Sequence, residues 1–241
     1  MKLSAPIYIL KQQAKALSQR DKLRLHIALD HVAVREGFKA WSHLASVWQR
    51  DDTSRSVYEQ LRPGDLILVG SRPGQGKTLL SIGLAVEAMT SGNRAAFFTL
   101  EYTAAEVESR FEVLGRSLKE FKSSLIVDTS DDISAGHIAQ RIAGEPPGTL
   151  VVVDYLQLLD QRRDKPSLDV QVRDLKTLAH NTQSMIVCLS QITRDYTLSS
   201  RASPSLQDVR MPNPADLSIF DKACFIQDGK MQLHSARTGA A

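Results

Sequence analysis

The chain has 241 residues, of which 42% are hydrophobic and 24% charged, and its formal net charge is +3. These values are typical of a folded protein with one sizeable domain and a small appendage, and they exclude a disordered chain. The sequence contains no run of about 18 apolar residues, and its first residues lack the apolar core and cleavage site of a secretory signal. We therefore expect a cytoplasmic protein without a membrane span.

The charge is distributed unevenly. Residues 1–62 contain 11 Lys and Arg against 6 Asp and Glu, a balance of +5, whereas the rest of the chain contains 19 against 21, a balance of −2. This asymmetry is compatible with a polyanionic partner, although basic helix residues more often form a solvated surface. The two cysteines, Cys188 and Cys224, lie in apolar runs without a CxxC motif. They are predicted to be buried thiols in a reducing compartment, not metal ligands.

Residues 1–50 are predicted to form a small helical domain. Apolar residues recur at helical spacing in three stretches, and Gly37 separates the second from the third. The three stripes are Ile9, Leu10, Ala14 and Leu17; Leu25, Ala28, Leu29, Val32 and Ala33; and Phe38, Trp41, Leu44, Ala45 and Trp48. We expect the tryptophans to pack in the core of this domain. The polar residues 51–62 are predicted to be a linker.

Residues 63–241 are predicted to form a second domain of the α/β class. Short apolar runs alternate with amphipathic stretches, as in DLILVG followed by TLLSIGLAVEAM. This alternation predicts a mostly parallel sheet flanked by helices. Residues 193–214 lack periodicity and are predicted to be a functional or disordered loop. The segment KACFIQDGKMQLHS is predicted to be a hairpin that turns at Asp228-Gly229.

The segment SRPGQGKT follows the first predicted strand and precedes a helix. Glycines there let backbone N–H groups turn toward an anion at the helix N-terminus. A lysine and a threonine hydroxyl follow, as in a loop that binds the phosphates of ATP or GTP together with Mg²⁺. The template asks for glycine where the chain has Ser71. The alternative is an ordinary strand-to-helix turn. The residues predicted to bind nucleotide are Ser71, Arg72, Pro73, Gly74, Gln75, Gly76, Lys77, Thr78 and Leu79.

Three further polar residues follow predicted strands. Asp154 ends the run LVVVD and is predicted to hold Mg²⁺ together with Thr78. Glu101 follows AAFFTL and is predicted to act as a general base toward water, and Gln191 is predicted to sense the γ-phosphate. The alternative for Asp154 and Glu101 is a helix cap, and for Gln191 a polar strand end without a role.

Together these motifs resemble the RecA-like motor domain of the DnaB family of replicative helicases. The residues that carry the resemblance are SRPGQGKT, AAFFTLEYTAAEVESRF, VVVDYLQLL, DLKTLA and CLSQITR, and they span about Leu61 to Arg194. The resemblance implies a RecA fold, hydrolysis of ATP with Mg²⁺, catalytic roles for Lys77, Glu101 and Gln191, a part in DNA replication and a hexameric ring around single-stranded DNA. It does not extend to the last residues, where the family places an arginine that reaches a neighbour's ATP and this sequence reads QLHSARTGAA.

Basic residues after two strands are candidates for DNA contact, although such clusters are often merely solvated. They are Arg162, Arg163, Lys165, Arg194, Arg201 and Arg210, and Tyr196 is the one obvious aromatic platform among them. The first functional hypothesis is a DnaB-like ATPase acting on DNA as a helicase or translocase. The alternative is a KaiC- or RadA-like regulatory or assembly module whose N-terminal helices bind a protein partner.

Overall fold

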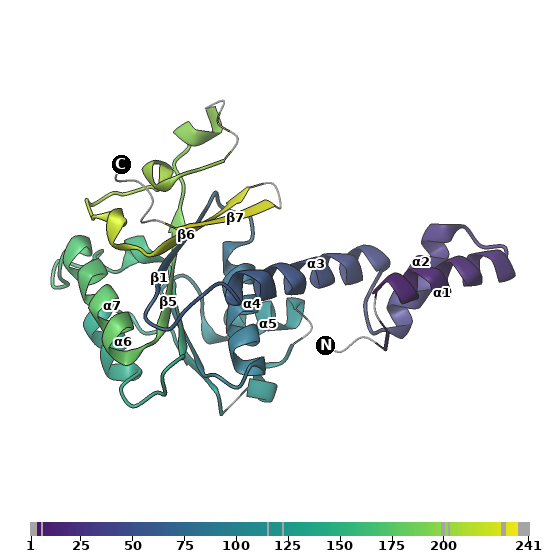
Figure 1. Cartoon of the computed structure of the whole chain (residues 1–241), viewed down its shortest axis with the longest axis horizontal. Coiled ribbons are helices and arrows are strands. Elements are labelled where there is room, and N and C mark those ends of the chain that lie inside the picture. The colour runs from purple at the N-terminus through teal and green to yellow at the C-terminus, as the bar shows by residue number, and fades with distance from the viewer. Residues whose placement is uncertain are drawn as a thin grey trace.

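The computed structural model describes residues 4–5, 7–114, 116–121, 123–198, 201, 203–227 and 230–235. Figure 1 shows two parts of unequal size, joined by the long helix α3 (Trp41–Tyr58). The larger part, here called the sheet domain, contains every strand of the described chain, while the smaller part lies at the far end of α3. Within the described residues, none of the helices combines the length and apolarity needed to cross a bilayer.

The sheet domain is built from strands and helices in alternation. The strands are β1 (Leu66–Ser71), β2 (Ala95–Thr99), β3 (Leu125–Asp128), β4 (Leu150–Asp154), β5 (Met185–Gln191), β6 (Lys222–Gln227) and β7 (Lys230–Ser235). The α-helices are α4 (Lys77–Thr90), α5 (Ala104–Val113), α6 (Ala135–Arg141) and α7 (Leu168–Thr182). Short 3₁₀ helices are η1 (Leu118–Phe121), η2 (Leu156–Leu158), η3 (Asp195–Leu198), η4 (Leu206–Asp208) and η5 (Leu217–Ile219).

The seven strands form one sheet in the order β3-β2-β4-β5-β1-β6-β7. Every pairing is parallel except that of β6 with β7, which is antiparallel. The predicted mostly parallel, helix-flanked sheet and its terminal hairpin are thus confirmed, and the hairpin's predicted turn at Asp228-Gly229 lies outside the described residues. Strands β1, β2 and β4 are buried at every position, as expected of strands covered on both faces.

Two apolar layers cover the sheet. On one face, Val107 and Phe111 of α5 pack with apolar residues of α4. On the other face, Ile138 of α6 packs with Val172 and Leu175 of α7. Cys188 and Cys224 are buried free thiols, as predicted, and burial raises the pKa of Cys224 to about 12.

The smaller part, here called the N-terminal unit (residues 4–47), is formed by α1 (Ile7–Arg20), α2 (Leu25–Arg35) and the first turns of α3. Its separate core confirms much of the predicted stripes, with Trp41 packed against its edge. The core residues are Leu10, Ala14, Val32, Ala33, Phe38, Leu44 and Val47. The side chain of Trp48 lies outside the described residues. Leu25, predicted to face the core, is 43% exposed.

The predicted linker differs from the structure. Residues 51–58 continue α3 without a break, so the N-terminal unit and the sheet domain share one helix. The reason is that this polar stretch still buries Ser54 and Val57, and Val57 joins the apolar layer beneath α4 and α5. Helices α3 and α4 approach closely, since a Cβ placed on Gly83 would lie 2.2 Å from Ser54 Oγ.

The predicted loop at residues 193–214 also has more structure than its sequence suggests. It contains η3 and η4, and an antiparallel bridge pairs Ile192 with Val209. The Arg210 N–H donates to the Gln191 carbonyl at 2.7 Å, so the two ends of the excursion are held together. A reciprocal cap between Ser205 and Asp208 orders η4.

The contact of α3 with α4 gives a test. We expect Gly83→Ala to lower the free energy of unfolding by about 1–3 kcal/mol, because the added methyl group overpacks the crossing. Ser54→Gly alone should cost about 1 kcal/mol of stability, because glycine is unfavourable within a helix, but it makes room for the methyl group at residue 83. The double variant should therefore lose less stability than the two single variants together. Denaturant titration measures each value.

The matched control is Gly136→Ala in α6, where an added Cβ meets nothing within 4 Å. That change should leave stability unchanged or raise it by up to about 1 kcal/mol. If Gly83→Ala changes stability as little as Gly136→Ala does, the close approach of α3 and α4 at Gly83 is contradicted.

Candidate nucleotide-binding site

The order of the strands brings the predicted site residues to one edge of the sheet. Strands β2, β4, β5 and β1 are consecutive neighbours and parallel, so their carboxyl ends lie side by side. The register pairs Thr99 with Asp154 and Ser71 with Gln191. Glu101 follows β2 directly, and α4 begins just after β1.

The loop between β1 and α4 has the backbone that its glycines predict. Gly74 and Gly76 have φ angles of 78° and 93°, which only glycine adopts readily. An added Cβ at either position meets no atom within 4 Å, so glycine is needed there for its backbone conformation and not because space is short. Ser71, where the template asks for glycine, ends β1 with an extended backbone that any residue adopts. Its hydroxyl donates to the Arg72 carbonyl at 2.9 Å. The departure from the template therefore leaves the loop intact.

Helix α4 directs its N-terminus at this loop and has 14 residues, so its first N–H groups favour an anion there. Lys77 and Thr78 open the helix and are 7% and 8% exposed. The Lys77 ammonium lies 5.9 Å from the centre of the Tyr155 ring. Arg72 braces the loop from outside by donating to the Ile192 carbonyl at 3.2 Å.

Asp154 lies beside the start of α4. The Thr78 hydroxyl donates to Asp154 Oδ2 over 3.4 Å, a long hydrogen bond, and Oδ1 is buried without a hydrogen-bond partner in the described part of the chain. The pKa of Asp154 is raised to about 7, chiefly by burial and also by the charge of Glu101, while Lys77 and Thr78 oppose the rise. A buried carboxylate with an unsatisfied oxygen next to a hydroxyl is an oxygen donor set that suits Mg²⁺.

Glu101 is exposed at the same edge, and its charge acts on both Asp154 and Tyr155. Thr99 Oγ1 accepts the backbone N–H groups of Glu101 and Tyr102 at 3.1 and 3.2 Å, which fixes the turn that carries the carboxylate. Sequence reasoning assigned Thr99 no role. A threonine two residues before the candidate base was the available signal.

Gln191 lies at the end of β5 and is linked to the excursion that follows it. Arg210 Nη1 approaches Gln191 Oε1 at 3.4 Å. Buried Gln157 connects the same region to β4, because its Nε2 donates to Ser190 Oγ and to the Arg210 carbonyl, each at 2.6 Å. In the sequence Gln157 stands out only as part of DYLQL, since periodicity does not indicate which strand a buried amide will reach.

A cavity of about 320 Å³ adjoins the phosphate-binding loop, a size within the usual range for small-molecule sites. Its walls come from the loop, the start of α4, the β6–β7 hairpin and, unexpectedly, α3. The lining residues are Ser46, Thr53, Ser54, Gly74, Gln75, Gly76, Leu79, Leu80, Ile226 and Met231. Sequence reasoning missed the contributions of α3 and the hairpin because both are distant from the loop in the sequence.

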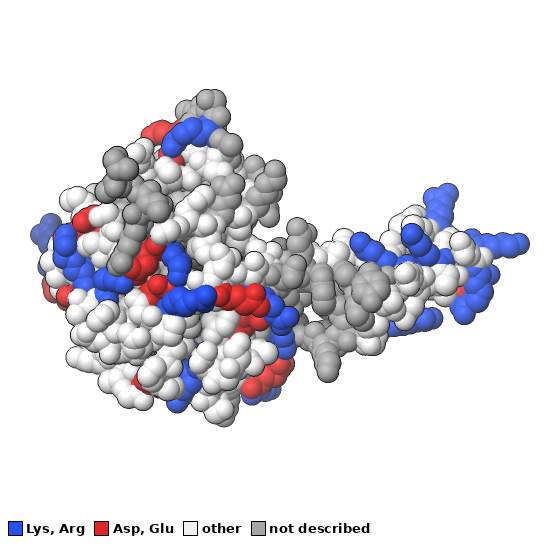
Figure 2. Space-filling model, in the orientation of Figure 1, with Lys and Arg blue, Asp and Glu red and all other residues white. Residues whose placement is uncertain are grey.

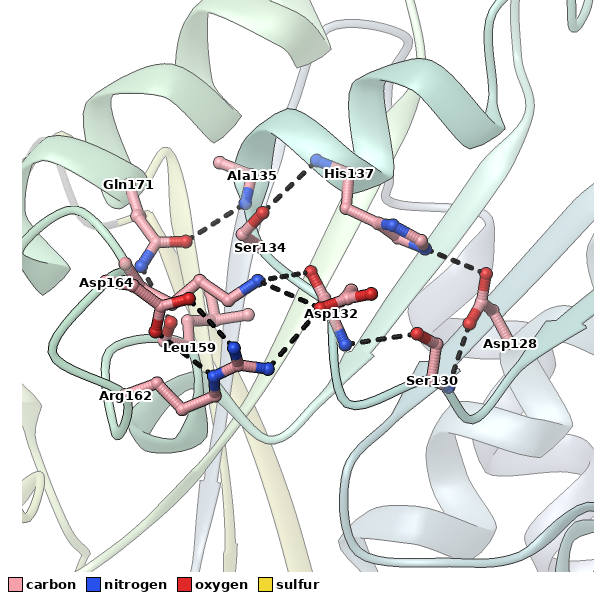
Figure 3. A network of polar contacts seen from close by, with 11 residues as sticks. Asp128, Ser130, Asp132, Ser134, Ala135, His137, Leu159, Arg162, Asp164 and Gln171 are labelled. Carbon is pink, nitrogen blue, oxygen red and sulfur yellow. Dashed lines mark hydrogen bonds and ion pairs between the residues drawn. The ribbon is translucent and has the colours of Figure 1, made fainter.

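The candidate DNA-contact residues have unequal surroundings. Figure 3 shows Arg162 between Asp132 and Asp164, at 3.4 and 2.9 Å, and Lys165 Nζ donates to the Asp132 carbonyl at 2.8 Å. Arg201 forms an ion pair with Asp208. In the described ranges, Arg163 and Arg194 have no ion pair and are exposed.

The prediction that Tyr196 offers an aromatic platform to DNA is wrong. Tyr196 is only 4% exposed and belongs to the apolar layer over α6 and α7. Its hydroxyl lies 2.6 Å from Gln227 Oε1. The ring is therefore packed in the fold and does not offer a face to a base. Arg237, which does not sit in the pattern of the family's trans-acting arginine, lies outside the described residues.

These features define the class of the larger part by its fold, which is RecA-like. Residues 111–216 match the family model described as the DnaB-like helicase C terminal domain. The predicted resemblance to the DnaB-like helicase motor domain is thereby confirmed for the sheet domain.

Two relatives and one solved structure are similar to this chain. The replicative DNA helicase DnaB of Haemophilus influenzae is 29% identical over 198 residues, covering 66% of this chain and 42% of that protein. That of Geobacillus stearothermophilus is 26% identical over 192 residues, covering 65% and 42%. The chain thus spans less than half the length of these curated relatives. A solved DnaB-like replicative helicase, described with its interactions with primase, has 18% identity and a TM-score of 0.59, covering 92% of this chain and 67% of that one.

The surroundings of Asp154 predict that Asp154→Asn raises the free energy of unfolding by an amount that depends on pH, in protein without nucleotide or metal. The folded pKa of about 7 lies above the ordinary 3.8, so the buried carboxylate costs stability as the pH rises from about 4 to about 7. The asparagine variant avoids this cost. Its advantage should be small near pH 4 and reach a few kcal/mol above pH 7.

Denaturant titrations across this pH range measure the difference. Asp164→Asn is a suitable control, because Arg162 pairs with that exposed carboxylate and lowers its pKa, which gives the opposite sign. A stability difference for Asp154→Asn that does not change with pH would contradict a buried carboxylate whose pKa is raised.

Proposed function

We propose that this protein binds and hydrolyses ATP with Mg²⁺ and acts on DNA as a DnaB-like helicase or translocase-type motor. The observation that carries the proposal is the convergence of Lys77, Thr78 and Asp154 at the mouth of the phosphate-binding loop. The domain's match to replicative helicases supports the DNA-directed part. The two buried free thiols support a reducing, cytoplasmic setting.

In this proposal the chain's own groups bind the triphosphate. Backbone N–H groups around Gly74 and Gly76 and the α4 N-terminus surround the β- and γ-phosphates, and the Lys77 ammonium neutralises their charge. The cavity beside the loop receives the nucleoside. Thr78 and Asp154 would hold Mg²⁺, which supplies charge neutralisation of the phosphates when bound.

Glu101 lies at the same edge without being buried, so it is placed to orient and deprotonate a water molecule in front of the γ-phosphate. Gln191 would detect the γ-phosphate through its amide. Its links to Arg210 and, through Gln157, to β4 give that signal a route into the excursion after β5. We propose that Arg194 and Arg210 in this excursion, and Arg163 in the loop before α7, meet DNA and that a homo-oligomeric ring forms.

The second candidate is a regulatory or assembly module driven by ATP, without unwinding. It is favoured by the unbroken helix α3, which links the cavity wall directly to the N-terminal unit and to any protein partner of that unit. Both candidates use the same nucleotide site, so DNA dependence and assembly must distinguish them.

Two substitutions test the chemistry. Lys77→Ala should abolish detectable ATP binding, because the phosphates lose their main positive charge. Glu101→Gln should retain ATP binding but reduce turnover by about 10²-fold or more, since the water loses its base. Phosphate release and nucleotide titration measure the two properties.

Glu112→Gln on α5 is a control expected to leave both properties unchanged, because its exposed carboxylate has no role in the proposed site. Retained turnover in Glu101→Gln would remove Glu101 from its role without affecting the binding assignment.

A mass measurement with and without nucleotide and an oligonucleotide distinguishes the two candidate functions. The motor predicts larger assemblies with ATP, and a hydrolysis rate stimulated by single-stranded DNA. A chain that hydrolyses ATP at an unchanged rate with DNA and stays monomeric is the regulatory module.

A further inference from the structure

The N-terminal unit and the adjoining helix differ sharply in charge. Residues 1–40 contain eight Lys and Arg against three Asp and Glu, whereas residues 41–62 contain three against three. Residues 4–47, the described N-terminal unit, contain seven Lys and Arg against three Asp and Glu, so +4 of the excess lies in the part of the molecule farthest from the sheet domain. Figure 2 shows blue side chains gathered over that end, with very little red among them.

The three acidic side chains of this part are already engaged inside it. Asp30 accepts the Trp41 backbone N–H at 2.8 Å, and Glu36 accepts the Ser4 backbone N–H at 2.8 Å. Asp21 accepts from Arg20 at 2.6 Å, and this hydrogen bond lowers the pKa of Asp21, helped by the charges of Arg35 and His31. Asp30 and Glu36 thus accept backbone N–H groups, and Asp21 pairs chiefly with its neighbour Arg20. Across the described residues, the following form no ion pair: Lys11, Lys15, Lys22, Arg24, Arg35 and Lys39.

Four of these cations follow one another along the first part of the chain. Lys11 and Lys15 are one turn apart on α1, about 6 Å along its axis, and Lys22 lies in the connection between α1 and α2. Arg24 comes directly before α2. All four are exposed. A row of cations suits a linear polyanion better than a compact ligand, because each cation meets a successive negative charge.

The neighbouring face of α2 adds apolar surface. Ile27 is 36% and Val34 59% exposed, and Arg24 and Arg35 flank them. DNA presents both phosphate charge and the less polar edges of sugars and bases, whereas an inorganic anion offers charge alone. The combination therefore favours nucleic acid.

We propose that the N-terminal unit is a second DNA-binding site, which holds the phosphate backbone along Lys11, Lys15, Lys22 and Arg24. It is separate from the proposed contacts at Arg163, Arg194 and Arg210 of the sheet domain, and it requires no nucleotide. Because α3 joins the unit to the sheet domain, a strand held there is kept at high effective concentration near the motor.

The test removes charge while preserving the fold in the full chain. In the variant K11Q/K15Q/K22G/R24Q, glycine is used at Lys22 because its φ of 52° is left-handed and glycine adopts it without strain. Binding of a fluorescently labelled oligonucleotide is followed by anisotropy, without nucleotide, at about 50 to 200 mM salt. We expect Kd to rise at least about tenfold and the slope of log K against log salt to fall by about 0.7 for each phosphate that the variant no longer neutralises.

The matched control K11R/K15R/R24K keeps every charge and should keep both affinity and slope. Circular dichroism and thermal melting establish that each variant is folded. If the folded charge-removed variant binds DNA with unchanged affinity and salt slope, the proposal is overturned, and an acidic protein surface becomes the partner to seek.

Lys77→Ala separates this site from the motor. It should leave nucleotide-free DNA binding by the N-terminal unit unchanged while ATP binding is lost. If the unmodified protein does not hydrolyse ATP but the charge-removed variant loses DNA affinity, only the proposed function is contradicted. If the unmodified protein hydrolyses ATP but charge removal has no effect on DNA affinity, only this inference is contradicted.

Discussion

The structure of the candidate site depends on the position of one buried carboxylate. Asp154 ends the fully buried strand β4. Glu101 follows the neighbouring strand β2, and the start of helix α4 brings Lys77 and Thr78 to the same carboxylate. A charge so far from water is unfavourable unless cations or donors compensate it. In the free protein the Thr78 hydroxyl and the Lys77 ammonium do so only in part, which leaves an unsatisfied oxygen and a raised pKa. The unfavourable state of the free protein is what makes the site receptive to a positively charged ligand.

Much of this arrangement follows from sequence alone, for a definite reason. Uniformly apolar runs such as LVVVD predict strands covered on both faces, and parallel strands end at a common edge, so polar residues just past each run must meet there. Gly74 and Gly76 indicate the loop because only glycine adopts their φ angles readily. The helical spacing of apolar residues likewise predicted the separate core of the N-terminal unit.

The features that sequence could not supply all depend on contacts between distant segments. Residues 51–58 are polar enough to suggest a linker, yet Val57 and Ser54 find apolar and close-packed partners on α4, and the helix continues. Tyr196 lies in a basic, Ser-rich stretch, yet its ring packs against the sheet domain because Gln227 accepts its hydroxyl. The amide of Gln157, just after β4, reaches Ser190 on the neighbouring strand β5, which no local pattern encodes. In each case tertiary packing overrides local composition.

The unbroken helix α3 has a geometric consequence for how the two parts of the molecule are oriented. A helix turns by about 100° and advances about 1.5 Å for each residue. Adding one residue within the middle of α3 would therefore rotate the basic row of the N-terminal unit far around the axis, whereas adding seven would return it almost to its original azimuth, about 10 Å farther out. The length of this helix, counted in single residues, thus sets the direction in which the charged end of the protein faces.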